Sequence, residues 1–133
     1  MTLHVQVVSP ERVLWSGDAE RVITRTLDDG DIAFLTGHTP FMAALGTGVT
    51  EILQEGGEVV RVAVHGGFVE VSDDRVSVLS DTAELASNVD VARAEAAKAT
   101  AEATLRDGDD EDAVAALQRA EVRLRAAGTS ASA

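Results

Sequence analysis

The sequence predicts a mainly β fold followed by α structure: a flattened antiparallel β-sandwich over residues 1–83 and a helix-turn-helix hairpin over residues 84–133. Two observations carry this prediction. Both Pro, all four aromatic residues and nine of the eleven Gly precede residue 84, whereas 16 of the last 50 residues are Ala. Apolar side chains recur with period two in the first part and at three- and four-residue steps in the second. The 133 residues suit one domain with a small appendage.

Short strands separated by turn residues are expected over residues 1–83. Alternating apolar residues mark three of them: Leu3, Val5 and Val7; Val60, Val62 and Val64; and Val76 and Val78. Turns are expected where Gly and Asp gather: Gly17-Asp18, Asp28-Asp29-Gly30, Gly46-Thr47-Gly48, Gly56-Gly57, Gly66-Gly67 and Asp73-Asp74. This spacing predicts eight to ten antiparallel strands in two packed sheets. A parallel nucleotide-binding sheet is disfavoured, because no strand precedes a helix-length segment and no Gly-rich phosphate motif occurs.

Two helices joined by a tight turn are expected over residues 90–127. Asn88 or Asp90 is suited to cap the first helix, and Gly108 to end it. The facing stripes are Val91, Ala94, Lys98, Ala101 and Leu105 on the first helix and Ala113, Leu117, Ala120, Leu124 and Ala127 on the second. Such stripes bury little apolar area, so we expect a weakly adhering hairpin that can detach and reopen. Residues 128–133 are expected to fray.

The net charge of −12, from 11 Lys and Arg against 23 Asp and Glu, disfavours binding to nucleic acids and anionic lipids. Neither part of the chain is basic. The absence of Cys excludes disulfides, thiolate zinc sites and cysteine nucleophiles. No apolar run approaches the roughly 18 residues of a membrane span, and the first residues lack the features of a signal peptide. We therefore expect no nucleic-acid partner, no direct membrane insertion and a cytoplasmic location.

No catalytic or metal-binding constellation emerges from the residue pattern. The three His, at positions 4, 38 and 65, have no spacing that places two on one metal ion. The acidic run over residues 107–112 lacks the Glu of a calcium loop, because Gln118 stands in its place, and we interpret the run as a solvated turn. No Ser lies in a G-x-S-x-G elbow. A catalytic carboxylate pair stays open but requires a cleft, so we expect no catalytic residues and no metal site.

The most unusual stretch runs from Asp31 to Met42 and contains the corner Gly37-His38-Thr39-Pro40. Two interpretations fit it. In the first, the stretch is a rim loop that presents a contact surface to a partner. In the second, Gly drives a turn in which His38 hydrogen-bonds its own loop and Phe41 enters the core. Residue types alone favour the second.

Five segments in a characteristic order carry a family resemblance. They are VSPERVLWSG (8–17), GHTPF (37–41), VHGGFVEV (64–71), VSVLSDTAE (76–84) and DVARAEA (90–96). Each is weak alone, but together, with strands first and an alanine-rich hairpin last, they resemble the epsilon subunit of the bacterial F-type ATP synthase, called delta in mitochondria. The resemblance covers almost the whole chain. Ten Arg against one Lys and abundant Ala indicate a GC-rich genome, and we expect an actinobacterial source.

The resemblance implies a sandwich of about ten strands and a non-catalytic function in a proton-translocating enzyme complex. Members of this family belong to the central stalk, bind the gamma subunit and the c-subunit ring, and couple ring rotation to ATP synthesis in the catalytic alpha/beta head. Asp31, His38 and Pro40 correspond to the interface with the c-ring and gamma, which reverses the preference that residue types gave. The implied location is peripheral, at the cytoplasmic face of the cell membrane.

The resemblance also implies a regulatory hairpin. In bacterial members the two helices can extend along gamma into the head, where basic residues of the second helix inhibit ATP hydrolysis. Arg119, Arg123 and Arg125 are the residues available for such contacts. The alternative is that they are solvated partners of Glu121 and nearby acids, whose pairing contributes little.

Some members of the family bind regulatory ATP on the folded hairpin through an I/L-D-x-x-R-A motif. The segment 89–94 matches this motif at Asp90 and Arg93. Ala126 and Ser130 stand where ATP-binding members carry Arg, and the second helix is expected to end at Gly128. These departures favour Asp90 as a helix cap, and we expect no cofactor apart from such regulatory ATP.

Two further hypotheses stay open. A free-standing ATP-sensing regulatory protein would use Asp90 and Arg93 as its binding residues. A small β-sandwich enzyme would require a cleft lined by His38 or His65 together with carboxylates.

Overall fold

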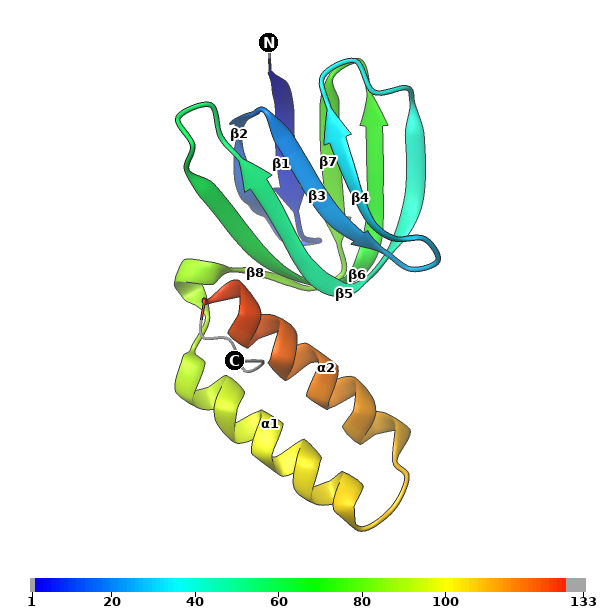
Figure 1. Cartoon of the computed structure of the whole chain (residues 1–133), viewed down its shortest axis with the longest axis vertical. Helices are drawn as coiled ribbons and strands as arrows, with labels where there is room; N and C mark the ends of the chain where they lie inside the picture. Colours follow the sequence, from blue (N-terminus) through cyan, green and yellow to red (C-terminus); the bar gives the residue numbers. More distant parts are fainter. Residues whose placement is uncertain (1, 129–133) are drawn as a thin grey trace.

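The computed structural model describes residues 2–128, so the predicted fraying of residues 129–133 and the position of Ser130 lie outside the described residues. Eight strands precede two helices (Figure 1). The strands are β1 (Leu3–Val8), β2 (Val13–Ala19), β3 (Arg21–Thr26), β4 (Gly30–Leu35), β5 (Phe41–Leu53), β6 (Val59–Ser72), β7 (Arg75–Ser80) and β8 (Ala83–Leu85). A 3-10 turn (Ala86–Asn88) leads to α1 (Val91–Arg106) and α2 (Glu111–Ala126). The composition change at residue 83 falls within β8, and the division of the chain at that point stays a prediction.

The described strands form one hydrogen-bonded sheet that curls into a flattened sandwich. Its order is β2-β1-β7-β6-β5-β3-β4, and β8 pairs with β6. The expectation of purely antiparallel pairing is wrong at one place, because β1 and β7 are parallel. In the sequence, five other strands lie between β1 and β7. The two strands are therefore not joined by a hairpin, which would force them to be antiparallel.

Glycine corners explain why the structure has eight strands where the resemblance implied about ten. The segments predicted as turns, Gly46-Thr47-Gly48 and Gly66-Gly67, lie inside β5 and β6, which run for 13 and 14 residues. Gly66 and Gly67 have φ of +85° and +124°, and a Cβ at Gly67 would lie 2.1 Å from the Leu79 carbonyl oxygen. Only glycine tolerates such a corner. Division of β5 and β6 at these corners would turn eight strands into ten.

The predicted alternation of apolar side chains builds the core. The inward-facing residues of β1, β6 and β7 lie between the layers, and the fully buried Phe34 of β4 joins them; they are Leu3, Val5, Val7, Val62, Val64, Val69, Val71, Val76 and Val78. The turn predicted at Gly17-Asp18 is wrong as well, because both residues lie within β2. A Cβ there would lie 2.9 Å from the Trp15 ring, so this glycine makes room for an indole.

The hairpin follows the predicted pattern. The Asp90 side chain accepts a hydrogen bond from the Arg93 backbone N–H and caps α1, and Asp110 caps α2 in the same way. Gly108 has φ of +139° in the turn between the helices. Both predicted stripes face inward: Ala94 and Ala101 of α1 are buried, as are Ala113, Ala120 and Leu124 of α2. No helix in the described part of the chain is long and apolar enough to cross a bilayer.

α2 has a second buried face that the sequence pattern did not reveal. This helix lies between α1 and the sandwich (Figure 1). Val122 and Ala126 pack against Ala63 of β6, with Val49 of β5 and Ala86 beside them. The hairpin therefore docks on the sandwich through a small apolar contact made by α2.

Candidate functional site

The predicted corner at residues 37–40 lies between β4 and β5, at the end of the sandwich remote from the hairpin (Figure 1). The His38 ring packs edge-on against Phe34 at 5.0 Å between centroids, and its Nδ1 lies 2.7 Å from the Thr39 carbonyl oxygen. Phe41 is partly buried against the core. The local geometry is thus the Gly-driven turn of the second interpretation, while Pro40 stays exposed beside it.

This corner is tied to the neighbouring turn between β6 and β7. The Gly37 backbone N–H donates to Asp74 Oδ1 at 2.8 Å. Asp73 and Asp74 both have positive φ, which is the geometry of a two-residue type I′ hairpin turn. The hydrogen bond gives the remote end of the sandwich a defined shape.

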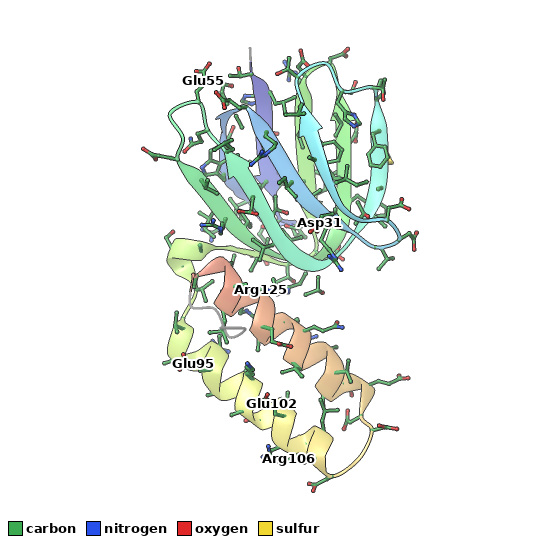
Figure 2. All side chains as sticks on the ribbon, viewed as in Figure 1. Asp31, Glu55, Glu95, Glu102, Arg106 and Arg125 are labelled. Carbon is green, nitrogen blue, oxygen red and sulfur yellow. The ribbon has the colours of Figure 1, made fainter. Side chains whose placement is uncertain are left out.

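Asp31 does not lie beside His38 and Pro40. It stands next to the β3–β4 turn, at the hairpin end of the sandwich, on the same side as Arg125 (Figure 2). Asp31 and Leu35 are four positions apart in the extended strand β4, a span of about 13 Å. The expectation of one continuous rim from Asp31 to His38 is therefore wrong, because an extended strand carries the two residues to opposite ends of the sandwich. Asp31 pairs with Arg25 at 3.5 Å, and both side chains are more than half exposed.

An apolar patch on the outer face of the sheet was not predicted. Met42, Phe68 and Leu79, called here the outer apolar patch, are 65%, 54% and 43% exposed. Phe68 of β6 lies opposite Leu79 of β7 and Ala44 of β5 in the register, and Met42 shares the Ala44 face. Exposed apolar side chains that lie side by side are typical of surfaces that contact other proteins. The available signal was Phe68 itself, an aromatic residue in the outward phase of a strand whose inward residues are Val69 and Val71.

The three arginines predicted on the second helix do not form one surface. Arg123 Nε lies 2.5 Å from Glu84 Oε1 of β8, with the side chains 27% and 31% exposed. Arg119 lies one turn earlier and is exposed. Arg125 is displaced from Arg123 by about 160° around the helix and lines a cleft on the other side. Glu121, the partner considered from the sequence, also lines that cleft.

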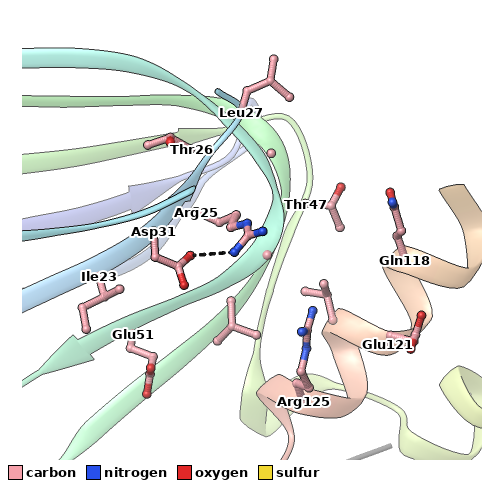
Figure 3. A pocket seen from close by; sticks show the side chains of 14 residues that line it. Ile23, Arg25, Thr26, Leu27, Asp31, Thr47, Glu51, Gln118, Glu121 and Arg125 are labelled. Atoms are coloured by element: carbon pink, nitrogen blue, oxygen red, sulfur yellow. Dashed lines mark ion pairs between the residues drawn. The ribbon is translucent and has the colours of Figure 1, made fainter. Parts of the chain in front are cut away.

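The cleft lies between α2 and the β3–β5 face of the sheet and has a volume of about 520 Å³ (Figure 3). Its wall includes Gly46 and Gly48, and a Cβ at Gly48 would lie 2.5 Å from the Arg25 Cβ. Glycine at position 48 therefore makes room for the Arg25 side chain, which also lines the cleft. The hypothesis of a β-sandwich enzyme requires a cleft lined by His38 or His65. Neither residue lines this cleft. Among residues 2–128, no group of three or more His, Asp and Glu side chains is placed to hold a metal ion.

The two predicted ATP-binding residues lie in the first turn of α1. Asp90 Oδ1 accepts the hydrogen bond from the Arg93 backbone N–H at 3.0 Å, which confirms Asp90 as the helix cap. The Arg93 side chain is exposed. Ala126, where ATP-binding members carry Arg, is buried against the sheet.

His65 of β6 lies at the interface between sandwich and hairpin. Both ring nitrogens are buried and have no hydrogen-bond partner among the described residues. Burial lowers the pKa of His65 to about 4, and the positive charges of Arg123 and Arg119 act in the same direction, while Glu84 opposes them. At neutral pH the ring is therefore uncharged.

The fold defines a class of protein, a small β-sandwich with an appended helical hairpin, and its distinctive features are the surfaces described above. Comparison with known families identifies the family to which the chain belongs. The family model described as "ATP synthase, Delta/Epsilon chain, beta-sandwich domain" matches residues 2–86, and "ATP synthase, Delta/Epsilon chain, long alpha-helix domain" matches residues 87–128. The chain belongs to the delta/epsilon family of ATP synthase subunits, as the sequence predicted.

Individual relatives agree with this assignment. The chain is 47% identical over 124 residues to the ATP synthase epsilon chain of Streptomyces griseus, covering 93% of this chain and 94% of that one. It is 46% identical over 129 residues to the epsilon chain of Thermobifida fusca, with coverage of 94% and 91%. Several of these relatives come from actinobacteria, in keeping with the expected source.

Solved structures share the fold. A chain of the Euglena gracilis mitochondrial ATP synthase, in a structure of OSCP, F1 and the c-ring, has a TM-score of 0.71 at 21% identity, covering 96% of this chain and 78% of that one. A chain from the central stalk and c-ring of the Tetrahymena thermophila mitochondrial ATP synthase has a TM-score of 0.62 at 17% identity, with 98% of each chain covered.

Proposed function

We propose that this protein is a non-catalytic subunit of the central stalk of a proton-translocating F-type ATP synthase. In this function it rotates with the c-ring and couples that rotation to ATP synthesis in the catalytic alpha/beta head. The observation that carries the proposal is the match of both family domains, in order, over residues 2–128. The chemistry then belongs to neighbouring subunits, and the protein is peripheral at the cytoplasmic face of the membrane.

The sandwich would supply two separate contacts. The outer apolar patch continues from the His38–Pro40 corner, because Met42 follows Pro40 at the start of β5. We assign this apolar surface to the gamma subunit. The β3–β4 turn with Asp31 is acidic and lies at the opposite end, which suits the polar loops of the c-ring. The separation of Asp31 from His38 lets one small domain contact both partners at once.

Single cysteines test this assignment cleanly, because the chain has none of its own. Phe68→Cys and Asp31→Cys would be introduced separately and treated with a short bifunctional cross-linker in native membranes. We expect adducts with gamma from Phe68→Cys and with subunit c from Asp31→Cys. Glu55→Cys, on the β5–β6 turn (Figure 2), is the matched control and should give neither adduct. A chain that never co-purifies with gamma, the c-ring or the head would refute the proposed function itself.

The hairpin would supply regulation. Its small Ala-rich seam and its small contact with the sandwich suit a part that occupies two arrangements of similar free energy. We propose that the released hairpin inhibits ATP hydrolysis through Arg119, Arg123 and Arg125. In the docked arrangement Arg123 is held by Glu84, so release is needed before this guanidinium can meet another carboxylate.

A further inference from the structure

His65 occupies the face of the sandwich that α2 covers. Residues two apart in a strand point to the same side, so His65 shares the outward face of Ala63. Ala63 is fully buried against Val122 and Ala126 of α2, and it lies opposite Glu84 of β8 in the register. Docking of α2 is therefore what buries the His65 ring.

The surroundings of the ring are arranged for a neutral imidazole. Arg119 and Arg123 from α2 and Glu84 from β8 are the charged groups that act on it. On β5 the residue opposite His65 is the uncharged Thr47, and Asp81 lies next to Gly66 on the link between β7 and β8. The carboxylate of Glu84 is already bound to Arg123 at 2.5 Å. A protonated ring would thus stand without a hydrogen-bond acceptor beside two guanidinium groups.

We propose that protonation of His65 releases the hairpin from the sandwich, so that this histidine makes the docking of α2 dependent on pH. The neutral ring can stay buried beneath α2 although its two nitrogens have no hydrogen-bond partner. The imidazolium is stable only in the released arrangement, where water replaces α2 over the ring. The ring binds a proton more tightly in the released arrangement, and for this reason protons favour release.

The pH window follows from the two protonation equilibria. In the released arrangement the exposed ring has the ordinary histidine pKa of about 6.5, whereas docking lowers it to about 4. Docking is unaffected well above pH 6.5, because the ring is then neutral in both arrangements. The docking constant falls as the pH drops through 6.5, by at most about eightfold per pH unit, and levels off below about pH 4, a total of about 300-fold.

A buried reporter thiol measures the docking constant in the full-length chain. Val122→Cys places the only thiol on the sheet-facing side of α2, at a position that is 2% exposed. Its rate of reaction with dithiodipyridine, divided by the rate of an unfolded peptide thiol at the same pH, gives the fraction of released hairpin. We expect this fraction to rise about fivefold between pH 6.5 and pH 5.5. A second reporter, Val69→Cys in the sandwich core, should not change over the same range.

Substitutions of His65 then decide whether this residue is responsible. His65→Asn and His65→Leu cannot be protonated, and both should abolish the pH dependence at Val122→Cys. His4→Gln, which removes an exposed histidine paired with Asp18, should leave it unchanged, and Glu84→Gln should retain the slope while it raises the released fraction. Equal slopes in wild type and both His65 variants would overturn the proposal, as would parallel changes at Val69→Cys.

Release of the hairpin is tested on the protein alone and does not depend on the proposed function. Its consequence for the enzyme does rest on that function. If the released hairpin inhibits hydrolysis, mild acidification on the cytoplasmic side would increase inhibition. Thiol exposure without any change in ATP hydrolysis would leave the His65 mechanism intact and refute the inhibitory function.

Discussion

The Arg123 guanidinium of α2 and the Glu84 carboxylate of β8 form an ion pair between the hairpin and the sandwich, with Nε and Oε1 2.5 Å apart. Each side chain is about two-thirds buried, so the pair is less screened by water than a surface pair. It lies beside the apolar contact of Val122 and Ala126 with Ala63. The ion pair thus helps to fix the orientation of α2 on the sandwich, where the apolar contact alone is small.

Removal of this ion pair should loosen the hairpin without unfolding the sandwich. We expect Glu84→Gln to weaken docking by about 1 kcal/mol, a value typical of a partly buried, hydrogen-bonded pair. Hydrogen exchange of the α2 amides should then accelerate about fivefold. Arg123→Gln should have a similar effect, and the double variant should add little to either. Arg125→Gln, on the far side of α2, is the control, and an equal acceleration there would contradict the assignment.

Deletion of the hairpin should separate assembly from inhibition. A chain truncated after Asn88 keeps β8 paired with β6 and loses both helices. We expect it to co-purify with the complex and to sustain ATP synthesis, because the proposed partner surfaces lie on the sandwich. Hydrolysis by purified complexes should rise several-fold, since the inhibitory arginines are gone. Unchanged hydrolysis in a complex that contains the truncated chain would refute the inhibitory function.

The sequence predicted the parts of the fold that depend on local periodicity. The buried valines of β1, β6 and β7 and both helix stripes follow directly from the spacing of apolar residues. The Asp90 cap was also predictable, because capping involves residues only three positions apart. These features need no knowledge of distant contacts.

Features set by distant contacts could not be predicted in the same way. Gly67 looks like a turn residue in the sequence, yet it lies within β6, where the Leu79 carbonyl group of β7 occupies the space that a side chain would need. The second buried face of α2 depends on where the helix docks. The separation of Asp31 from His38 depends on residues 31–35 being an extended strand and not a loop.

An acidic residue in the outer apolar patch should block the proposed contact with gamma. Phe68→Asp places a charge on a side chain that is already 54% exposed, so the free energy of unfolding of the isolated chain should change by no more than about 1 kcal/mol. In cell membranes, however, the variant should fail to co-purify with gamma, because a carboxylate would be desolvated in an apolar contact. Leu27→Asp, at an apolar residue of the β3–β4 turn that is 65% exposed, should retain the contact with gamma. If the Phe68→Asp variant still co-purifies with gamma, the outer apolar patch is not the contact with gamma.

Asp90 and Arg93 can be separated into a structural and a ligand-binding function by paired substitutions. Because Asp90 Oδ1 caps α1, Asp90→Ala should destabilise the hairpin by about 1 kcal/mol, whereas Asp90→Asn should retain the cap. Arg93→Ala should have little effect on stability, because this side chain is exposed. For ATP we expect no saturable heat in calorimetry at millimolar concentration, since the cap uses Asp90 and the buried Ala126 offers no guanidinium. Saturable heat that both Asp90→Ala and Arg93→Ala abolish would instead establish an ATP site on the folded hairpin.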